Sequence, residues 1–113
     1  MVTQYIPDRG DLVWLDFDPQ TGHEQKGLRP ALVLTPASYN KLTNLAIFCP
    51  ITNQEKGYPF EVKLPQDCSI KGVVLSDHVK SLDWNERSAK FICKISQEII
   101  NDVVNNINKL IWL

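Results

Sequence analysis

The sequence has 113 residues, the length of one small domain, and we expect a single domain over residues 1–113. Hydrophobic side chains make up 43% of it, which is typical of a globular chain and excludes a disordered tail. The formal net charge of -1 excludes a protein that coats nucleic acid through a general excess of lysine and arginine. Any nucleic-acid site must therefore concentrate its cations in one place.

The cysteines and the short apolar runs indicate a cytoplasmic protein. The three cysteines, Cys49, Cys68 and Cys93, are odd in number and lack a CxxC spacing, so neither a disulfide framework nor a zinc knuckle is indicated. The first residues, MVTQYIPDRGD, do not have the basic start and apolar stretch of a signal peptide. No apolar run approaches the ~18 residues of a membrane-spanning helix. We expect free thiols in a reducing cytosol.

The first half of the chain predicts two strands separated by a loop. Residues 11–18, DLVWLDFD, alternate as a strand does, and Trp14 shares a face with two carboxylates, so we expect it to be partly exposed. One face carries Val13, Leu15 and Phe17, and the other carries Leu12, Trp14, Asp16 and Asp18. Residues 19–28 contain turn residues without periodicity, and we interpret them as a mobile loop. Residues 29–35, RPALVLT, are apolar on both faces, as in a central strand that begins with Arg-Pro.

The remainder predicts short strands and two helical segments. Thr35 and Pro36 resemble a helix N-cap and first helical position, which gives one or two turns over PASYNKL. Five more strands are predicted over residues 45–51, 59–64, 72–76, 79–84 and 89–95. After Ser96, a plausible N-cap, the apolar period becomes helical: the face carries Ile99, Val103, Ile107 and Leu110, with Ile100, Val104 and Ile111 beside it. About seven short strands and one amphipathic C-terminal helix predict a mostly β (α+β) protein, a small antiparallel barrel or curled sheet.

Several enzyme classes are excluded because their motifs are missing. The two histidines, His23 and His78, have no metal-binding spacing, so neither a zinc site nor a metal-centred hydrolase is expected. The sequence contains no GxSxG, P-loop or dinucleotide-binding glycine pattern. What remains are polar residues near predicted strand ends, where such groups converge without disrupting a core. They are His23, Glu24, Arg29, Thr52, Asp77 and His78, and taken singly each has an ordinary explanation as an ion pair, turn cap or solvated residue.

The sequence contains the stretches GDLVWLDFDP, GHEQKGLRPALVLTP, CPIT, KGYPFEV and GVVLSDHVKSLDW. Together these run nearly end to end and resemble the MazF/PemK family of toxin endoribonucleases from bacterial toxin–antitoxin pairs. The resemblance implies a small SH3-like antiparallel β-barrel of the CcdB/PemK-like toxin fold, assembled as a homodimer. It also implies metal-independent, sequence-specific cleavage of single-stranded mRNA without a cofactor. A cognate MazE-like antitoxin would block the RNA groove with an acidic tail, and DNA would be bound only indirectly through that complex.

The resemblance further implies which residues act. The implied catalytic positions are Arg29, Thr52, Glu24, His23 and Asp77. Arg29 in the RP motif, Thr52 after the CP strand and the loop residue Glu24 belong to the MazF-type assignment. His23 and Asp77 match positions proposed for the PemK branch, which carries an arginine where this chain has Leu75. We therefore favour the MazF-type assignment.

These side chains suit RNA cleavage because RNA supplies its own nucleophile, the 2′-hydroxyl, which DNA lacks. The reaction needs a proton acceptor, a proton donor and stabilisation of a phosphorane. We expect Arg29 and Thr52 to stabilise the transition state, and either Glu24 or His23 to take the 2′-proton. The expected products are a 2′,3′-cyclic phosphate and a 5′-hydroxyl.

The expected RNA-binding residues combine aromatic rings, which stack on bases, with lysines, which meet phosphates. They are Trp14, Gln25, Lys56, Tyr58 and Lys80. Trp14 has an equally weighted alternative, in which it packs at a dimer interface or under the loop.

Two other classes of function remain open from the sequence. CcdB-like noncatalytic toxins bind DNA gyrase through a C-terminal segment with a tryptophan, and this chain ends in KLIWL. The ordinary explanation is that Trp112 is a helix-end aromatic that covers the core. The HEQxGxRP and CPIT motifs also have no purpose in a gyrase poison. A noncatalytic adaptor that presents a protein-binding groove is the third possibility.

Overall fold

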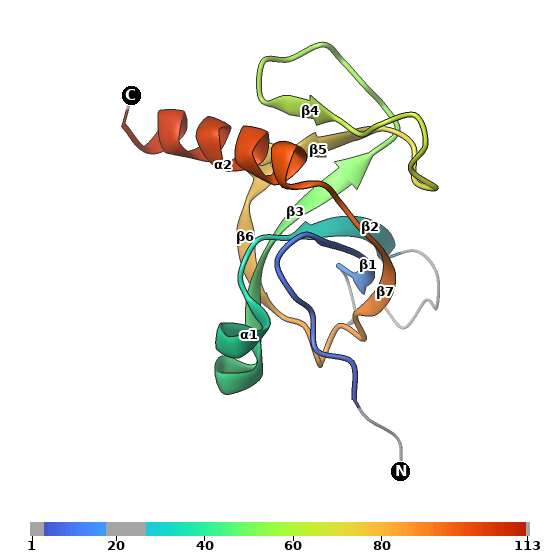
Figure 1. Cartoon of the computed structure of the whole chain (residues 1–113), viewed down its shortest axis with the longest axis vertical. Helices are drawn as coiled ribbons and strands as arrows, with labels where there is room; N and C mark the ends of the chain where they lie inside the picture. Colours follow the sequence, from blue (N-terminus) through green and yellow to red (C-terminus); the bar gives the residue numbers. More distant parts are fainter. Residues whose placement is uncertain (1–3, 18–26, 113) are drawn as a thin grey trace.

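The computed structural model describes residues 4–17 and 27–112 (Figure 1). In this part of the chain there are seven strands: β1 (Asp11–Asp16), β2 (Leu28–Val33), β3 (Leu45–Thr52), β4 (Glu61–Lys63), β5 (Val73–Leu75), β6 (Lys80–Asp83) and β7 (Lys90–Lys94). The helices are α1 (Ala37–Thr43) and α2 (Gln97–Ile111), and a 3₁₀ turn, η1 (Ser76–His78), follows β5. Each predicted strand overlaps an observed one. Most of the predicted loop 19–28 lies outside the described residues, and Leu28 belongs to β2.

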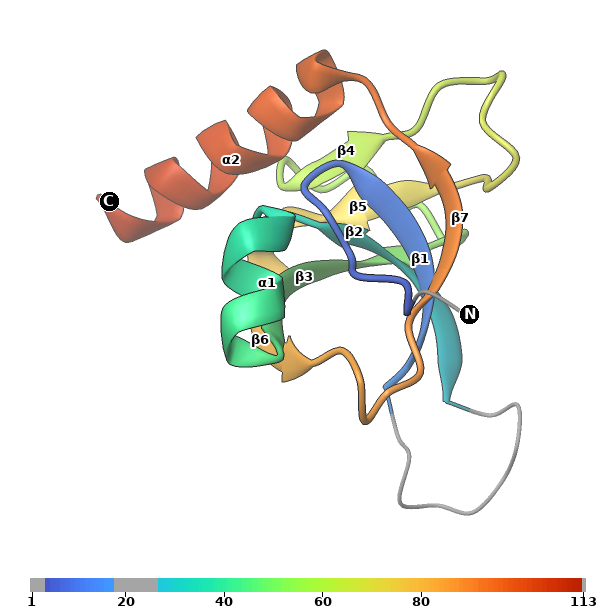
Figure 2. The ribbon, with the colours of Figure 1, turned by 60° about the horizontal axis from the view of Figure 1, so that its bottom comes forward.

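The sheet is antiparallel throughout the described residues and centres on β3. The strand order is β4-β5-β3-β2-β1-β7, and β6 also pairs with β3. The first half of β3 pairs with β6, its middle with β2 and its last residues with β5. In Figures 1 and 2, β1, β2, β3, β6 and β7 curl around, while β4 and β5 extend beside α2. The prediction of a mostly β antiparallel protein with a C-terminal helix is confirmed.

The central strands are buried on both faces because each face of the sheet has its own core. Alternate residues of β1, β2 and β3, such as Leu12, Leu32 and Cys49, pack against Ile100 and Val103 of α2. The intervening residues form the second core, which consists of Val13, Leu15, Ala31, Val33, Ala46, Phe48 and Trp84. Two cores explain why RPALVLT is apolar without alternation. Trp14 is 40% exposed, as expected from its shared face with carboxylates.

The helix boundaries and one end of α2 differ from the sequence-based expectation. Pro36 has an extended backbone (φ -72°, ψ 156°), so it is the N-cap of α1 in place of Thr35. The Thr35 hydroxyl instead donates to Asn40 Oδ1 at 2.7 Å. α2 begins after Ser96, as predicted, and no helix in the described chain is long and apolar enough to cross a membrane.

Only part of the predicted apolar face of α2 is buried. Ile100 and Val103 are buried, and Ile99 and Ile107 pack beside them. The last turn extends past the sheet (Figure 1), and Trp112 is 78% exposed. The expectation that Trp112 covers the core is therefore wrong.

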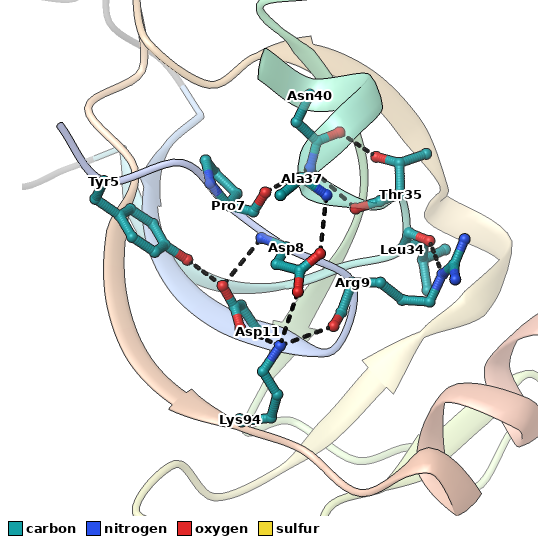
Figure 3. Close-up of polar contacts among 10 residues, drawn as sticks. All are labelled: Tyr5, Pro7, Asp8, Arg9, Asp11, Leu34, Thr35, Ala37, Asn40 and Lys94. Atoms are coloured by element: carbon teal, nitrogen blue, oxygen red, sulfur yellow. Dashed lines mark hydrogen bonds and ion pairs between the residues drawn. The ribbon is translucent and has the colours of Figure 1, made fainter. Parts of the chain in front are cut away.

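A buried carboxylate ties the N-terminal segment to the sheet (Figure 3). Asp11 is 3% exposed, and its carboxylate accepts hydrogen bonds from the Tyr5 hydroxyl at 2.5 Å and the Asp8 backbone N–H at 3.0 Å. Lys94 Nζ on β7 lies 2.9 Å from Asp11 Oδ1. These three partners bond both oxygens of the carboxylate, which offsets the cost of burying it. Burial and the bond to Asp11 raise the pKa of Tyr5, so the phenol stays a donor.

The same network reaches the start of α1. Asp8 Oδ1 accepts the Ala37 backbone N–H at 2.8 Å, and this bond is the largest cause that lowers the pKa of Asp8. Asn40, which is fully buried, donates to the carbonyl oxygens of Pro7 and Thr35 at 2.7 and 2.9 Å. Residues 5–11 therefore hold α1 and β7 in place through polar contacts.

We predict that Asp11→Asn destabilises the fold by about 2–4 kcal/mol, because the amide removes the buried charge opposite Lys94 and one acceptor. Urea unfolding followed by circular dichroism measures the change. The matched control is Asp67→Asn, an exposed carboxylate, for which we expect a change within about 0.5 kcal/mol. Equal stability of the two variants would contradict the role assigned to Asp11.

Candidate active site

The register of β2 and β3 brings Arg29 and Thr52 together. Ala31 pairs with Pro50, and Leu32 pairs with Cys49. Continuing this register by two residues places Arg29 opposite Thr52, and both side chains line one pocket of about 440 Å³. Pro30 precedes the fully buried part of β2, so the backbone that carries Arg29 is held by the sheet.

Both side chains have hydrogen-bonding capacity to offer a ligand. The Gln54 backbone N–H donates to Thr52 Oγ1 at 3.1 Å, which leaves the hydroxyl proton of Thr52 to donate elsewhere. Within residues 4–17 and 27–112, the Arg29 guanidinium makes no hydrogen bond or ion pair. A guanidinium and a hydroxyl in one pocket form a site for an anion with several oxygens.

Three exposed side chains add positive charge and an aromatic ring to this pocket, which we call the Arg29 pocket. They are Lys56, Tyr58 and Lys80. The Glu61 carboxylate accepts hydrogen bonds from the backbone N–H groups of Lys56 and Gly57 at 2.9–3.2 Å. These bonds fix residues 56–60, which we call the KGYPF loop. Lys80 Nζ lies 5.6 Å from the centre of the Phe17 ring, so a cation–π contact holds it at the pocket.

The turn η1 supplies Asp77 and His78 to the Arg29 pocket. Ser76 is fully buried between them and the core: its backbone N–H donates to Phe60 O at 3.1 Å, and its Oγ accepts from Asn106 Nδ2 at 3.3 Å. His78 Nε2 lies 3.8 Å from Asp77 Oδ1. Burial, and then the charge of the Asp77 carboxylate, raise the pKa of the Cys49 thiol on β3 to about 12.

A second pocket, of about 540 Å³, adjoins the first and shares Arg29 and Thr52 with it. Trp14 and Lys71 line this Trp14 pocket, and Trp14 pairs with Pro30 across β1 and β2. Arg29 and Thr52 therefore stand between two hollows, each with an aromatic ring and a lysine. A polyanion that also carries flat rings matches this arrangement.

The structure brings together most of the residues singled out from the sequence. Arg29, Thr52, Asp77, Lys56, Tyr58 and Lys80 line the Arg29 pocket, and Trp14 lies in the adjoining one. His23, Glu24 and Gln25 lie outside the described residues. Among the pocket residues that the sequence did not single out are Phe17, Gln54, Glu61 and Lys71. His78 was one of the polar candidates near strand ends, but no role was assigned to it from the sequence.

No group of three His, Cys, Asp or Glu side chains that could hold a metal occurs in the described residues. The cations that face the Arg29 pocket are those of Arg29, Lys56 and Lys80.

A comparison with protein families matches residues 8–111 to the PemK-like, MazF-like toxin of type II toxin–antitoxin systems. The endoribonuclease toxin MazF of Escherichia coli K12 is 47% identical over 111 residues, which cover 98% of this chain and 99% of that protein. A crystal structure of MazF from Deinococcus radiodurans superposes with a TM-score of 0.88 at 49% identity, over 97% of this chain and 100% of that one. In a MazE–MazF complex from the same organism, the matching chain has a TM-score of 0.86 at 44% identity, over 96% of this chain and 97% of that one.

We predict that Gly72→Ala disturbs the site through the backbone of Thr52. Gly72 has φ +127°, and an added Cβ would stand 2.1 Å from the Thr52 carbonyl oxygen. The strained backbone and the overlap together should lower stability by about 2–4 kcal/mol. Chemical denaturation measures this loss.

The matched control is Gly57→Ala, where φ is +80° but no atom lies within 4 Å of the added Cβ. It should cost only the backbone strain, about 1 kcal/mol. If Gly72→Ala proves no less stable than Gly57→Ala, Gly72 does not pack on Thr52 as described.

Proposed function

Since the chain belongs to the MazF/PemK family of toxin endoribonucleases of type II toxin–antitoxin systems, we propose that it is a metal-independent endoribonuclease toxin. Its substrate is single-stranded RNA, cut at a specific short sequence, and a MazE-like antitoxin inhibits it. The observation that carries the proposal is the placement of Arg29 and Thr52 side by side between two pockets that contain aromatic rings and lysines.

In the proposed reaction, the 2′-hydroxyl of a ribose attacks the adjacent phosphorus, and negative charge accumulates on the nonbridging oxygens. Arg29 binds these oxygens through its fork of N–H groups, and its charge does not depend on pH near neutrality. Such a preorganised donor is worth roughly 3–4 kcal/mol in the transition state. Thr52 donates its free hydroxyl proton to a second oxygen of the same phosphate.

In this proposal Glu24 is the general base that takes the proton from the 2′-hydroxyl, and His23 is the alternative. Asp77, which lines the Arg29 pocket, is the candidate for acid–base catalysis in the PemK-type assignment. The bond between phosphorus and the 5′-oxygen then breaks. One fragment ends in a 2′,3′-cyclic phosphate and the other begins with a 5′-hydroxyl. DNA is spared because deoxyribose has no 2′-hydroxyl.

The proposed RNA path runs through both pockets and past Arg29. Bases stack on Trp14 and Tyr58, phosphates meet Lys56 and Lys80, and Gln25 contributes from the loop that precedes Arg29. The cations lie close together, so they attract phosphate locally although the net charge of the chain is -1. An acidic antitoxin tail carries charge of the same sign as RNA and competes for the same surface.

We further propose that the whole chain is one domain, that it acts in the cytoplasm as a homodimer, and that DNA is reached only through the antitoxin complex. The exposed apolar residues in the second half of α2 and just after it, Val104, Ile111 and Trp112, offer surface that a second subunit would bury.

A second candidate, gyrase binding, is favoured by one observation: Trp112 is 78% exposed, so a C-terminal aromatic is accessible to a partner. Gyrase binding through Trp112, however, gives no role to Arg29 and Thr52 or to the two pockets beside them.

We predict that the protein cuts defined single-stranded RNA in the presence of EDTA and that Arg29→Ala lowers the rate roughly 100- to 1000-fold. Mass spectrometry of the fragments should give 2′,3′-cyclic phosphate and 5′-hydroxyl ends, and a 2′-deoxy substitution at the cut site should block cleavage. Thr52→Ser should keep more activity than Thr52→Val, because serine keeps the hydroxyl.

The matched control is Arg9→Ala. Arg9 donates to the Leu34 carbonyl oxygen at 3.1 Å and lines neither pocket, so this variant should cut normally. Fragments with 5′-phosphate ends would refute the chemistry. Intact RNA together with inhibited gyrase would support the second candidate.

A further inference from the structure

We propose that His78 is the general acid that protonates the leaving 5′-oxygen. This inference rests on the ribonuclease function proposed above and assigns a role that the reaction otherwise lacks. It is carried by the position of His78 in the Arg29 pocket, on a turn that the core holds in place.

The position of His78 is fixed by its neighbours in η1. Ser76, two residues earlier, is fully buried and makes hydrogen bonds to Phe60 O and Asn106 Nδ2. Lys80, two residues later, pairs with Phe48 at the start of β6. His78 therefore stands on a short, doubly anchored turn, and its side chain is exposed toward the pocket.

The chemistry of the described pocket residues singles out the imidazole. Arginine, lysine and tyrosine release protons only well above neutral pH, whereas imidazole exchanges protons near neutrality. Glu61 is occupied by the backbone N–H groups of Lys56 and Gly57. The Asp77 carboxylate, 3.8 Å from His78 Nε2, is placed to orient the ring.

The charged groups around His78 come from several elements. β2 presents Arg29, the KGYPF loop presents Lys56, η1 presents Asp77, and β4 and β6 present Glu61 and Lys80. The helix packed against η1, α2, presents the neutral amide of Asn106. The imidazole therefore faces both the carboxylate of Asp77 and the cations that are proposed to hold the phosphate.

The proton balance of the step is complete. The 2′-oxygen forms a bond to phosphorus and loses its proton to the general base, while the bond from phosphorus to the 5′-oxygen breaks. His78 gives the 5′-oxygen a proton and becomes neutral. After release of the product, the general base gives its proton to water and His78 takes one from water, so both groups return to their starting states. No metal, oxidant or other reactant is consumed.

The test compares two substrates of the same sequence, one ordinary RNA and one with sulfur in place of the 5′-oxygen at the cut site. A thiolate leaves without protonation, so loss of the general acid does not slow its departure. We expect His78→Gln to cut ordinary RNA at least roughly 100-fold more slowly than wild type, and to cut the 5′-sulfur substrate at nearly the wild-type rate.

His23→Gln is the comparison variant, since His23 is the other histidine. Rescue by sulfur in His23→Gln and not in His78→Gln would overturn the inference, as would equal loss on both substrates in His78→Gln or normal cutting of ordinary RNA. A circular dichroism melt establishes that each variant is folded. If the wild-type protein cuts neither substrate, the proposed function itself fails, which is a different result.

The geometry also points, independently, to a modification site: Cys68 and Cys93 form an oxidisable dithiol. Both thiols pack on the core cluster beneath α2 and line one pocket of about 600 Å³. Cys68 is buried after a turn that begins at Pro65, and Cys93 lies on the edge strand β7 with partial exposure. The shared pocket and the shared core cluster bring the two thiols close together, and burial, followed by the neighbouring Cys68 thiol, raises the pKa of Cys93.

A disulfide here would reach the proposed active site through one loop. Residues 64–72 connect β4 to β5, and Ile70 and Lys71 in this loop line the Trp14 pocket beside Arg29 and Thr52. Joining Cys68 to β7 would fix that loop.

The oxidant is a small disulfide such as oxidised glutathione. Cys93, the more exposed thiol, attacks it and releases one glutathione thiol. Cys68 then attacks the mixed disulfide, forms the Cys68–Cys93 bond and releases the second glutathione, so two thiols are oxidised and one disulfide is reduced.

After incubation with oxidised glutathione, titration of the denatured protein measures how many free thiols remain, and mass spectrometry detects any bound glutathione. Wild type should fall from three thiols to one, and Cys49→Ser from two to none, without added mass. Cys68→Ser should instead retain one bound glutathione on Cys93. Three remaining thiols, or a stable mixed disulfide in wild type, would overturn the assignment.

Discussion

The arrangement of the site depends on one pairing, the antiparallel register of β2 against β3. Continued by two residues, that register places Arg29 opposite Thr52, and a slip of one strand by one residue would turn the side chains of that strand to the other face and separate the pair. The register is strongly specified because both faces of the two strands are buried: one face contributes Leu32 and Cys49 to the first core, and the other contributes Val33 and Phe48 to the second. The hydrophobic cores therefore fix the geometry of the polar pair.

Electrostatics around this pair are local. The chain as a whole is slightly acidic, yet Arg29, Lys56 and Lys80 face one pocket and Lys71 the adjoining one. Within a distance of about 10 Å, charges are only partly screened at moderate salt, so a cluster attracts phosphate even when the net charge does not. In the proposed function, short contacts therefore contribute more to RNA binding than long-range steering does.

The sequence predicted the strands and the C-terminal helix, because these follow from the spacing of apolar residues. It did not predict features that depend on contacts between residues far apart in the chain or on side-chain hydrogen bonds. Alternating apolar residues located the strands, and the two-sided apolar run identified β2 as central. The N-cap of α1 was misplaced by one residue because Pro36 is extended and the Thr35 hydroxyl bonds to Asn40. The contact of Lys80 with the Phe17 ring joins residues far apart in the chain, and no local pattern encodes it.

The residues of the site are carried either by core strands or by an exposed loop. The two groups are proposed to do different things: the strand residues stabilise the transition state, and the loop residues recognise the RNA. Arg29 and Thr52 are carried by strands that the cores hold, so their spacing is set by the whole sheet. Lys56 and Tyr58 belong to an exposed loop that a single carboxylate, Glu61, fixes through two backbone N–H groups. A loop held so locally tolerates sequence change at little cost to the fold. In the proposed function, recognition of a particular RNA sequence can therefore diverge through loop residues, while the residues proposed to stabilise the transition state keep their geometry.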